Sequence, residues 1–264
     1  MNIIEGKNTQ MIDTTFTKPT DIKKIIESKG KYTVLEYIQD MSVDPSKAIA
    51  SYFAAQMNIR KRQTAAVLNK GNGVVVQAGA MQWMAGDIEA QTNIKGVGDF
   101  FGKIVSSKVT GETAIKPRYT SSSEGILVLE PTYKHILLED VSEWGDGMVI
   151  EDGLFLACDD SINIRTVARS TFSSAALGGE GLFNSMLSGN GIAVLESNVP
   201  RSELVMVDLQ NDQLRIDGPY AIAWSKSLKF TVERTTKTLI GSAASGEGLV
   251  NVYRGTGKVL MAPI

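Results

Sequence analysis

The chain is poor in the residues that most often carry chemistry. Its 264 residues include one cysteine, Cys158, and one histidine, His135. A single cysteine excludes an intramolecular disulfide and a cluster of thiolate ligands, and it fits a reducing compartment. A single histidine leaves a histidine-based metal site without a second imidazole. We therefore expect neither a disulfide-rich domain nor a zinc-type centre, and we assign no cofactor.

Long apolar runs and an excess of positive charge are also absent. The longest apolar run, Leu154–Cys158, has five residues, whereas a membrane-spanning helix needs about 20. The start of the chain, Met1–Gly6, has neither the basic and apolar regions of a signal peptide nor the arginines of a transit peptide. The net charge of −2 disfavours a duplex-binding protein. We therefore expect a soluble cytoplasmic protein.

Glycine, by contrast, is abundant and stands in pairs around short apolar runs. The stretch Gly178–Phe183 is followed by a second glycine turn and apolar run in Ser188–Glu196, and the same phrase returns in Gly246–Asn251 and Gly255–Leu260. Glycine adopts positive φ at no steric cost, so this pattern predicts hairpin turns between strands. We expect turn conformations in particular at Gly181, Gly191 and Gly248.

Two landmarks recur at matching intervals. Members of the first kind, Gly111, Gly179 and Gly246, stand 68 and 67 residues apart. The second kind is a glycine followed by a short strand with an aromatic residue, at positions 79, 153 and 218. We predict three β units, roughly residues 60–124, 125–190 and 191–264, packed about a pseudo-threefold axis because each small unit would leave exposed edges. A last hairpin, Leu249–Met261, would close the ring against the first unit.

Individual stretches also favour β structure. The run Val67–Val76, interrupted by Lys70–Gly73, predicts a hairpin. Polar and apolar residues alternate in Ile162–Val167 and Leu228–Glu233, which is typical of strands with one buried face. The fold class that we predict is therefore all-β, in the form of antiparallel sandwich-like units.

Residues 1–59 differ in texture and predict an extension packed on the β core. We expect one short helix between Thr20 and Gly30, a strand at Lys31–Ile38, and a second helix that begins at Asp44-Pro45 and ends near Met57. An apolar stripe on the second helix should pack against a sheet; its residues are Ala48, Ile49, Tyr52 and Phe53.

These motifs resemble the mitochondrial biogenesis family named for altered inheritance of mitochondria, whose bacterial members are a domain of unknown function. The resemblance rests on Gly178–Glu196, Leu214–Glu233, Gly246–Met261 and Gly79–Met81, and it covers about residues 60–264. It implies a fold like that of the tryptophan RNA-binding attenuation protein (TRAP-like), with antiparallel strands in a double-stranded β-helix arrangement. The resemblance brings no catalytic residue that can be carried over, and without a transit peptide the chain looks like a bacterial member.

Three familiar catalytic or nucleotide motifs are incomplete. Gly241–Gly246 has the wrong spacing for a nucleophile elbow. Gly255–Lys258 lacks both the earlier glycine of a phosphate loop, where Val252 stands, and the following Ser or Thr, so we interpret it as a hairpin turn. A strand rather than a helix follows Gly178–Gly181, which argues against a dinucleotide fold. The strand position of His135 predicts a structural role.

Charged and aromatic clusters leave some alternatives open. We expect the carboxylates to lie in solvated loops, with a calcium site or a glycosidase pair as alternatives; they are Glu139, Asp140, Glu143, Asp146, Glu151, Asp152, Asp159 and Asp160. The basic run Arg60-Lys61-Arg62, with Lys116, Arg118 and Tyr119, could form an RNA-facing patch, although a charge-balanced strand face is favoured. We place Trp83, Trp144 and Trp224 in the core.

The leading hypothesis is a non-enzymatic scaffold or binding module that forms a homo-oligomer or binds a protein partner. We assign no catalytic, cofactor-binding or metal-binding residue. One alternative is an RNA- or small-ligand-binding protein that uses Arg60, Arg62, Lys116 and Arg118. Another is an unrecognised enzyme with a pocket in which carboxylates converge with His135.

Overall fold

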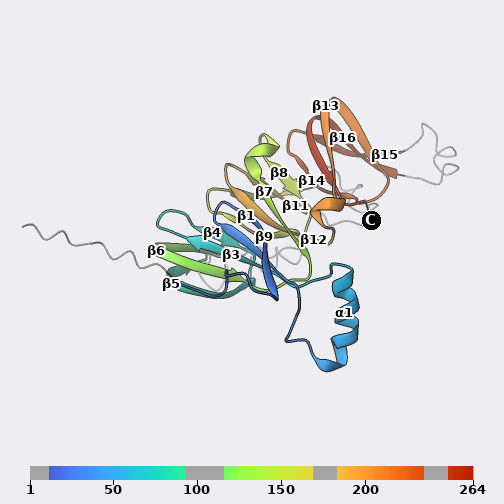
Figure 1. Ribbon diagram of the computed structural model, residues 1–264. Helices are drawn as coiled ribbons and strands as arrows, with labels where there is room; N and C mark the ends of the chain where they lie inside the picture. Colours follow the sequence, from blue (N-terminus) through green and yellow to red (C-terminus); the bar gives the residue numbers. More distant parts are fainter. Residues whose placement is uncertain (1–11, 93–115, 169–182, 235–248, 264) are drawn as a thin grey trace, which may run out of the picture.

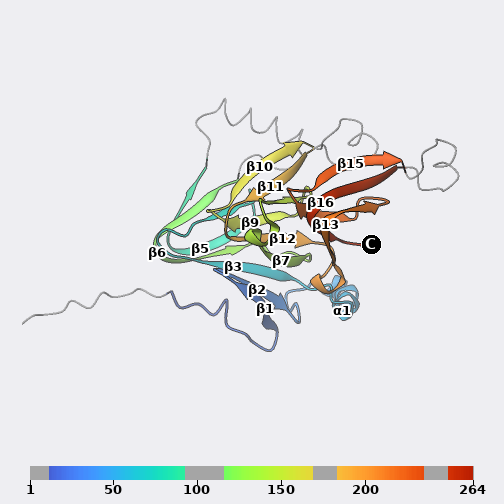
Figure 2. The same ribbon diagram turned by 90° about the horizontal axis from the view of Figure 1, so that it is seen from above.

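A computed structural model describes residues 12–92, 116–168, 183–234 and 249–263. The described chain is mostly β and forms two antiparallel sheets, one of them nearly closed into a barrel. Figures 1 and 2 show the two sheets side by side, and Figure 1 shows one short helix standing apart from both. The prediction of an all-β fold with a short N-terminal helix is confirmed. No helix in the described part is long and apolar enough to cross a membrane.

The larger sheet, sheet A, follows the order β1-β2-β3-β6-β4-β9-β12-β7, and β5 also pairs with β6. Its strands are β1 (Lys23–Lys29), β2 (Tyr32–Tyr37), β3 (Arg62–Leu68), β4 (Val74–Val76), β5 (Met81–Gln91), β6 (Arg118–Leu129), β7 (His135–Asp140), β9 (Phe155–Asp159) and β12 (Ile192–Ser197). Its interior buries a cluster of side chains that includes Tyr32, Val34, Leu68 and Leu127.

The smaller sheet, sheet B, follows the order β10-β11-β8-β14-β16-β13, and β15 pairs with β16. Its strands are β8 (Met148–Ile150), β10 (Asn163–Ala168), β11 (Phe183–Ser188), β13 (Val205–Ile216), β14 (Ala221–Ser225), β15 (Lys229–Arg234) and β16 (Leu249–Met261). A second buried cluster combines strands of both sheets, including Leu137 and Leu195 from sheet A with Ile150 and Leu260 from sheet B.

The helical elements are α1 (Ala48–Gln56) and three short 3-10 turns, η1 (Pro45–Lys47), η2 (Val141–Trp144) and η3 (Arg201–Glu203). The predicted start at Asp44 is confirmed, because its side chain accepts a hydrogen bond from the Ser46 backbone N–H at 2.8 Å. Trp144 and Trp224 are buried, as expected. Trp83 is half-buried on another cluster, where its ring meets Phe16 edge-on at 5.3 Å.

The predicted helix between Thr20 and Gly30 is wrong. This segment forms β1, which pairs antiparallel with β2 through a turn in which Gly30 adopts a φ of +58°. The β-branched side chains of Ile25 and Ile26 favour a strand over a helix. Pairing with β2 gives the segment backbone hydrogen bonds to a neighbouring strand, whereas a helix this short would be only marginally stable by itself. The predicted strand at Lys31–Ile38 is confirmed as β2.

Three predicted hairpins are also wrong. β3 and β4 both lie along the edge of the long strand β6 rather than pairing with each other. The turn Ser188–Gly191 connects β11 in sheet B to β12 in sheet A. Leu249–Met261 is one continuous strand that pairs with β13, β14 and β15, and it pairs with none of the strands described in residues 60–124. Glycine-rich stretches therefore occur within long strands and where the chain crosses from one sheet to the other, as well as at hairpin turns.

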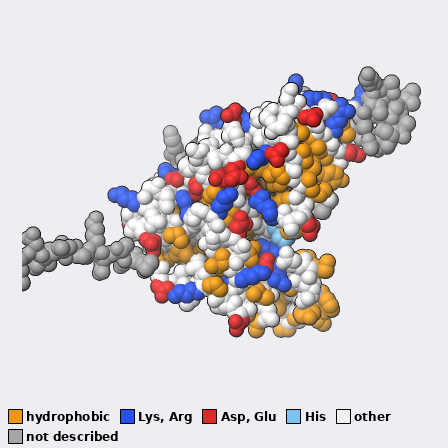
Figure 3. Space-filling model, turned by 45° about the horizontal axis from the view of Figure 1, so that its top comes forward, with side chains coloured by type: hydrophobic (Ala, Val, Ile, Leu, Met, Phe, Trp, Pro, Cys, Tyr) orange, Lys and Arg blue, Asp and Glu red, His pale blue; other side chains and the backbone are white. Residues whose placement is uncertain are grey.

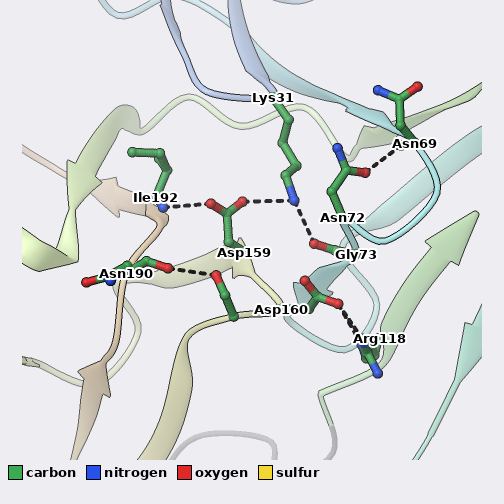
Figure 4. A network of polar contacts seen from close by, with 10 residues as sticks. Lys31, Asn69, Asn72, Gly73, Arg118, Asp159, Asp160, Asn190 and Ile192 are labelled. Carbon is green, nitrogen blue, oxygen red and sulfur yellow. Dashed lines mark hydrogen bonds and ion pairs between the residues drawn. The ribbon is translucent and has the colours of Figure 1, made fainter.

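A polar network fixes the turns at one end of sheet A (Figure 4). Asp159, at the end of β9, accepts a hydrogen bond from the Ile192 backbone N–H at 2.9 Å and pairs with the Lys31 ammonium at 3.2 Å. Lys31 in turn donates to the Gly73 carbonyl oxygen at 2.8 Å. The guanidinium of Arg118 binds Asp160. These contacts tie the β1–β2 turn to the loops before β4 and β12.

Gly191 is confined by this network. Its φ is +149°, and a Cβ atom placed on it would lie 2.9 Å from the Asp159 Cβ. Gly181 and Gly248, the other two predicted turn glycines, lie outside the described residues.

We predict that Gly191→Val lowers the free energy of unfolding by about 1–3 kcal/mol, because the new side chain meets both an unfavourable φ and the Asp159 side chain. Urea unfolding measures this loss. Gly153→Val is the matched control, since Gly153 also has positive φ but no atom within 4 Å of its Cβ position. The control should lose less stability, and equal losses in the two variants would contradict the packing argument.

Candidate functional site

Helix α1 is carried on an excursion between two neighbouring strands. β2 ends at Tyr37 and β3 begins at Arg62, so residues 38–61 leave sheet A and return to it. Glu36 and Arg62 are direct cross-strand partners at the base of this excursion. Figure 1 shows α1 standing away from the sheets on the two connecting segments.

A buried ion pair closes the base. Arg62 is 1% exposed, and its guanidinium contacts the Glu36 carboxylate at 2.8 Å. The same guanidinium donates to the carbonyl oxygens of Asn58 at 3.0 Å and Arg60 at 3.2 Å, and to that of Tyr133 at 3.4 Å. Arg62 therefore binds the returning segment of the excursion directly and connects it to the start of β7.

Glu36 is the centre of a small cationic cluster. Besides Arg62, its carboxylate contacts the Lys24 ammonium at 3.1 Å and the Arg60 guanidinium at 3.3 Å. Burial by itself raises the pKa of Glu36, but Lys24 and Arg62 outweigh burial and hold that pKa below its ordinary value. Nearby, Lys61 pairs with Asp40 at 3.0 Å and lies over the Tyr37 ring.

A cleft of about 440 Å³ separates α1 from the sheet. The helix contributes mainly small, half-buried residues to its wall, including Ala48, Ser51, Ala54 and Ala55. The remaining lining residues are seven apolar or aromatic side chains and five polar or charged ones; they are Tyr37, Ile38, Met41, Val43, Tyr52, Ile59 and Tyr133, with Gln39, Asp40, Gln56, Arg60 and Lys61. Neither His135 nor Cys158, the only residues of their kinds in the chain, lies among them.

The other face of α1 is apolar as well. Ile49 is 75% exposed, Phe53 64% and Met57 77%. Residues four apart in a helix share a face, and this stripe lies about 180° from Ala55 and Ser51. The predicted packing of Ile49 and Phe53 against a sheet is therefore wrong: α1 turns its small residues toward the protein and its large ones toward water. Figure 3 shows hydrophobic side chains gathered at the lower end of the molecule, where α1 lies.

The residues proposed for an RNA patch do not come together. Arg62, the first residue of β3, forms a backbone bridge with Thr132, which follows the end of β6. Arg118, by contrast, is the first residue of β6. A strand of twelve residues spans roughly 35 Å, so the two groups of cations lie at opposite ends. Two of these cations also already have partners, because Arg118 binds the Asp160 carboxylate and Lys116 donates to the Gln77 side chain. The predicted four-residue patch is wrong.

His135 is half-buried at the start of β7. Burial, and then the positive charge of Arg62, lower its pKa below the ordinary value. A second groove of about 350 Å³ does bring carboxylates near one another, namely Glu130, Asp152 and Glu196. His135 does not line it, and Glu196 pairs with Lys134 at 3.1 Å. The described grooves therefore do not combine carboxylates with His135 as the enzyme alternative requires.

Other predicted groups have structural partners. Glu139 is buried, contacts the Arg201 guanidinium and accepts from the Trp144 indole N–H at 3.4 Å. Asp140 caps η2 by accepting from the Ser142 backbone N–H at 3.0 Å. Cys158 is fully buried, and burial raises the pKa of its thiol, which keeps it protonated and unreactive.

The cleft was not found by sequence reasoning, although a signal for it exists. No charged residue occurs from Ala48 to Ile59, and the basic run Arg60-Lys61-Arg62 follows immediately. An uncharged helix next to a charged segment indicates that an apolar surface borders a charged one. Tyr133 reaches the cleft only through the fold, because it comes from the segment between β6 and β7, which is remote from α1 in the sequence.

Fold and site together define an all-β protein of two antiparallel sheets that carries a single projecting helix. The chain belongs to the AIM24 family (mitochondrial biogenesis AIM24), whose model matches residues 26–264. An uncharacterised protein of Streptococcus pyogenes serotype M6 is 29% identical over 198 residues, covering 73% of this chain and 77% of the relative. A crystal structure of another Streptococcus pyogenes protein superposes with a TM-score of 0.56 at 26% identity, covering 78% of this chain and 89% of that one. The predicted family membership is confirmed.

We predict that Glu36→Gln lowers the free energy of unfolding by about 3 kcal/mol, because it leaves the Arg62 guanidinium buried without its counter-charge. Chemical denaturation measures the loss. Lys24→Ala is the control: this side chain is 46% exposed, so losing its contact with Glu36 should cost less than about 1 kcal/mol. A Glu36→Gln loss no larger than that of Lys24→Ala would contradict the role given to the buried pair.

The stabilising effect of Glu36 should depend on pH. Its pKa in the folded protein lies below the ordinary value of 4.5, so its contribution is complete above about pH 4.5 and is lost as the pH falls through the folded pKa. The difference in unfolding free energy between the native protein and Glu36→Gln should therefore be constant from pH 7 to about 5 and shrink below it. A difference that grows on acidification would contradict the assignment.

Proposed function

We propose that this protein is a non-catalytic binding module that holds an apolar ligand, or an apolar side chain of a partner, in the cleft beneath α1. The single observation that carries the proposal is the cleft itself. Its volume of about 440 Å³ lies in the range of ligand pockets, and its lining combines aliphatic and aromatic side chains with polar and charged ones.

The charges around the cleft support an apolar rather than an ionic ligand. Arg60 contacts Glu36 and Lys61 contacts Asp40, so each cation at the rim already has a carboxylate partner. A nucleic acid would have to displace those carboxylates before it could use the cations. The small inner residues of α1, such as Ala55, leave room for a ligand instead of filling the space themselves.

A non-catalytic role receives support from the same lining. The chain's histidine and cysteine both lie elsewhere, and Ser51 has no imidazole beside it in the cleft. Nucleophilic catalysis by a hydroxyl needs a base within hydrogen-bond reach. The cleft therefore suits binding better than it suits acyl transfer or hydrolysis.

Filling the cleft tests the proposal. Ala55→Phe places a ring in the space under α1, and we predict that it weakens binding of the uncharged fluorescent probe N-phenyl-1-naphthylamine by about tenfold, or 1.4 kcal/mol. Fluorescence titration measures the affinity, and circular dichroism checks the fold.

The matched control is Ala90→Phe, the same change at an exposed alanine on β5, away from α1. It should leave probe affinity within about twofold of the native value. Equal affinity in Ala55→Phe and the native protein would remove the cleft as the site. Native mass spectrometry of the protein purified from its own host would then identify any ligand bound elsewhere.

A further inference from the structure

The outer face of α1 exposes large apolar side chains to water, whereas its inner face lines the cleft with small ones. A helix that is apolar all round is normally buried, yet α1 has no fully buried residue. Ile49, Phe53 and Met57 form a continuous exposed stripe at spacings of four residues. We propose that this stripe pairs with the same stripe of a second copy of the chain, in a two-fold symmetric, antiparallel arrangement. The proposal deepens the binding role proposed above but uses the opposite face of the helix.

The exposed apolar surface of the stripe suits a weak, reversible pair. Ile49, Phe53 and Met57 are each more than half exposed. At these exposures they present roughly 450 Å² of surface per copy. Two copies would therefore bury at most about 900 Å² in total, which is the size of a weak, transient interface rather than a permanent one.

The charge pattern fits a second copy. From Ala48 to Ile59 there is no residue of either charge, so the stripe meets its copy without like-charge repulsion. In an antiparallel pair the positive end of each helix dipole lies beside the negative end of the other, which is favourable. A two-fold interface needs a surface that is complementary to itself, and an uncharged aliphatic and aromatic stripe meets that requirement.

The same pattern argues against a lipid surface as the occupant. Helices that lie on membranes carry lysines and arginines on the face opposite their apolar face. The opposite face of α1 instead carries Ala48, Ser51 and Ala55, which line the cleft. The helix therefore lacks the cationic side that would hold it to anionic headgroups.

The symmetry fixes which residues meet. With Phe53 at the two-fold axis, each Phe53 lies against its own copy, and each Ile49 lies near Met57 of the second copy. Ala50, exposed beside Phe53, allows the helices to approach closely. The distance from Ile49 to its own copy is about 12 Å along the axis, since the two residues stand four positions on either side of the centre at about 1.5 Å per residue.

Analytical ultracentrifugation of the full chain tests the pairing. We expect a reversible dimer in the micromolar range for the native protein and at least a tenfold rise in the dissociation constant for Phe53→Glu, with its melting temperature unchanged because Phe53 is outside the core. Met206→Glu is the matched control. Met206 is 40% exposed on β13 in sheet B, and the change should leave the dimer intact.

Cysteine cross-linking tests the orientation. Cys158 is fully buried, so an introduced cysteine on α1 is the accessible thiol. Under mild oxidation Phe53→Cys should form a disulfide-linked dimer with itself. Ile49→Cys should not, because disulfides need Cα atoms within about 7 Å, but a mixture of Ile49→Cys and Met57→Cys should form the mixed dimer.

Three results would overturn the proposal. They are a native protein that stays monomeric up to about 100 µM, a dimer that survives Phe53→Glu, and efficient self-linking of Ile49→Cys. A monomer that native mass spectrometry finds with lipid or another protein on α1 would assign the stripe to that occupant instead. The cleft proposal is tested separately, because Ala55→Phe changes the inner face of α1. If Ala55→Phe loses probe binding and the native protein forms no dimer, the binding module is supported and the self-pairing is not.

Discussion

The buried contact between Glu36 and Arg62 is the constraint on which the functional surface depends. These residues face each other across β2 and β3, at the point where residues 38–61 leave sheet A and return. Two antiparallel neighbours are usually joined by a short turn, and here they are joined by a segment that carries a helix. The guanidinium holds the returning backbone through Asn58 and Arg60, so the ion pair fixes the base on which α1 and its cleft rest.

The two faces of α1 follow from its composition. Small residues face the sheet and leave the cleft open, whereas Ile49, Phe53 and Met57 face water. Burying the large residues against the sheet would gain more hydrophobic stabilisation for an isolated chain. Their outward position is consistent with a helix whose apolar surface is used in binding rather than in folding. The two sheets, by comparison, have well-filled cores and give the excursion a rigid support.

The sequence predicted the fold class, the family, β2 and the start of the helix, because those depend on local patterns and on motifs spread along the chain. It did not predict which strands pair. β3 and β4 share one edge of β6, and Ser188–Gly191 crosses between sheets, and such long-range choices leave no local signal. The basic run was visible, but the burial of Arg62 against Glu36 was not, since the register of β2 on β3 decides it. The TRAP-like arrangement and the three-unit division remain predictions.

Hydrogen–deuterium exchange across a dilution series tests most directly the claim that α1 is the interaction surface. If α1 serves as that surface, the backbone amides of residues 48–57 should exchange more slowly as the protein concentration rises, because pairing holds the helix against opening. The amides of β9 and β12 in the same samples should exchange at a constant rate. Exchange in α1 that does not change with concentration, while protection rises in some other segment, would contradict the account.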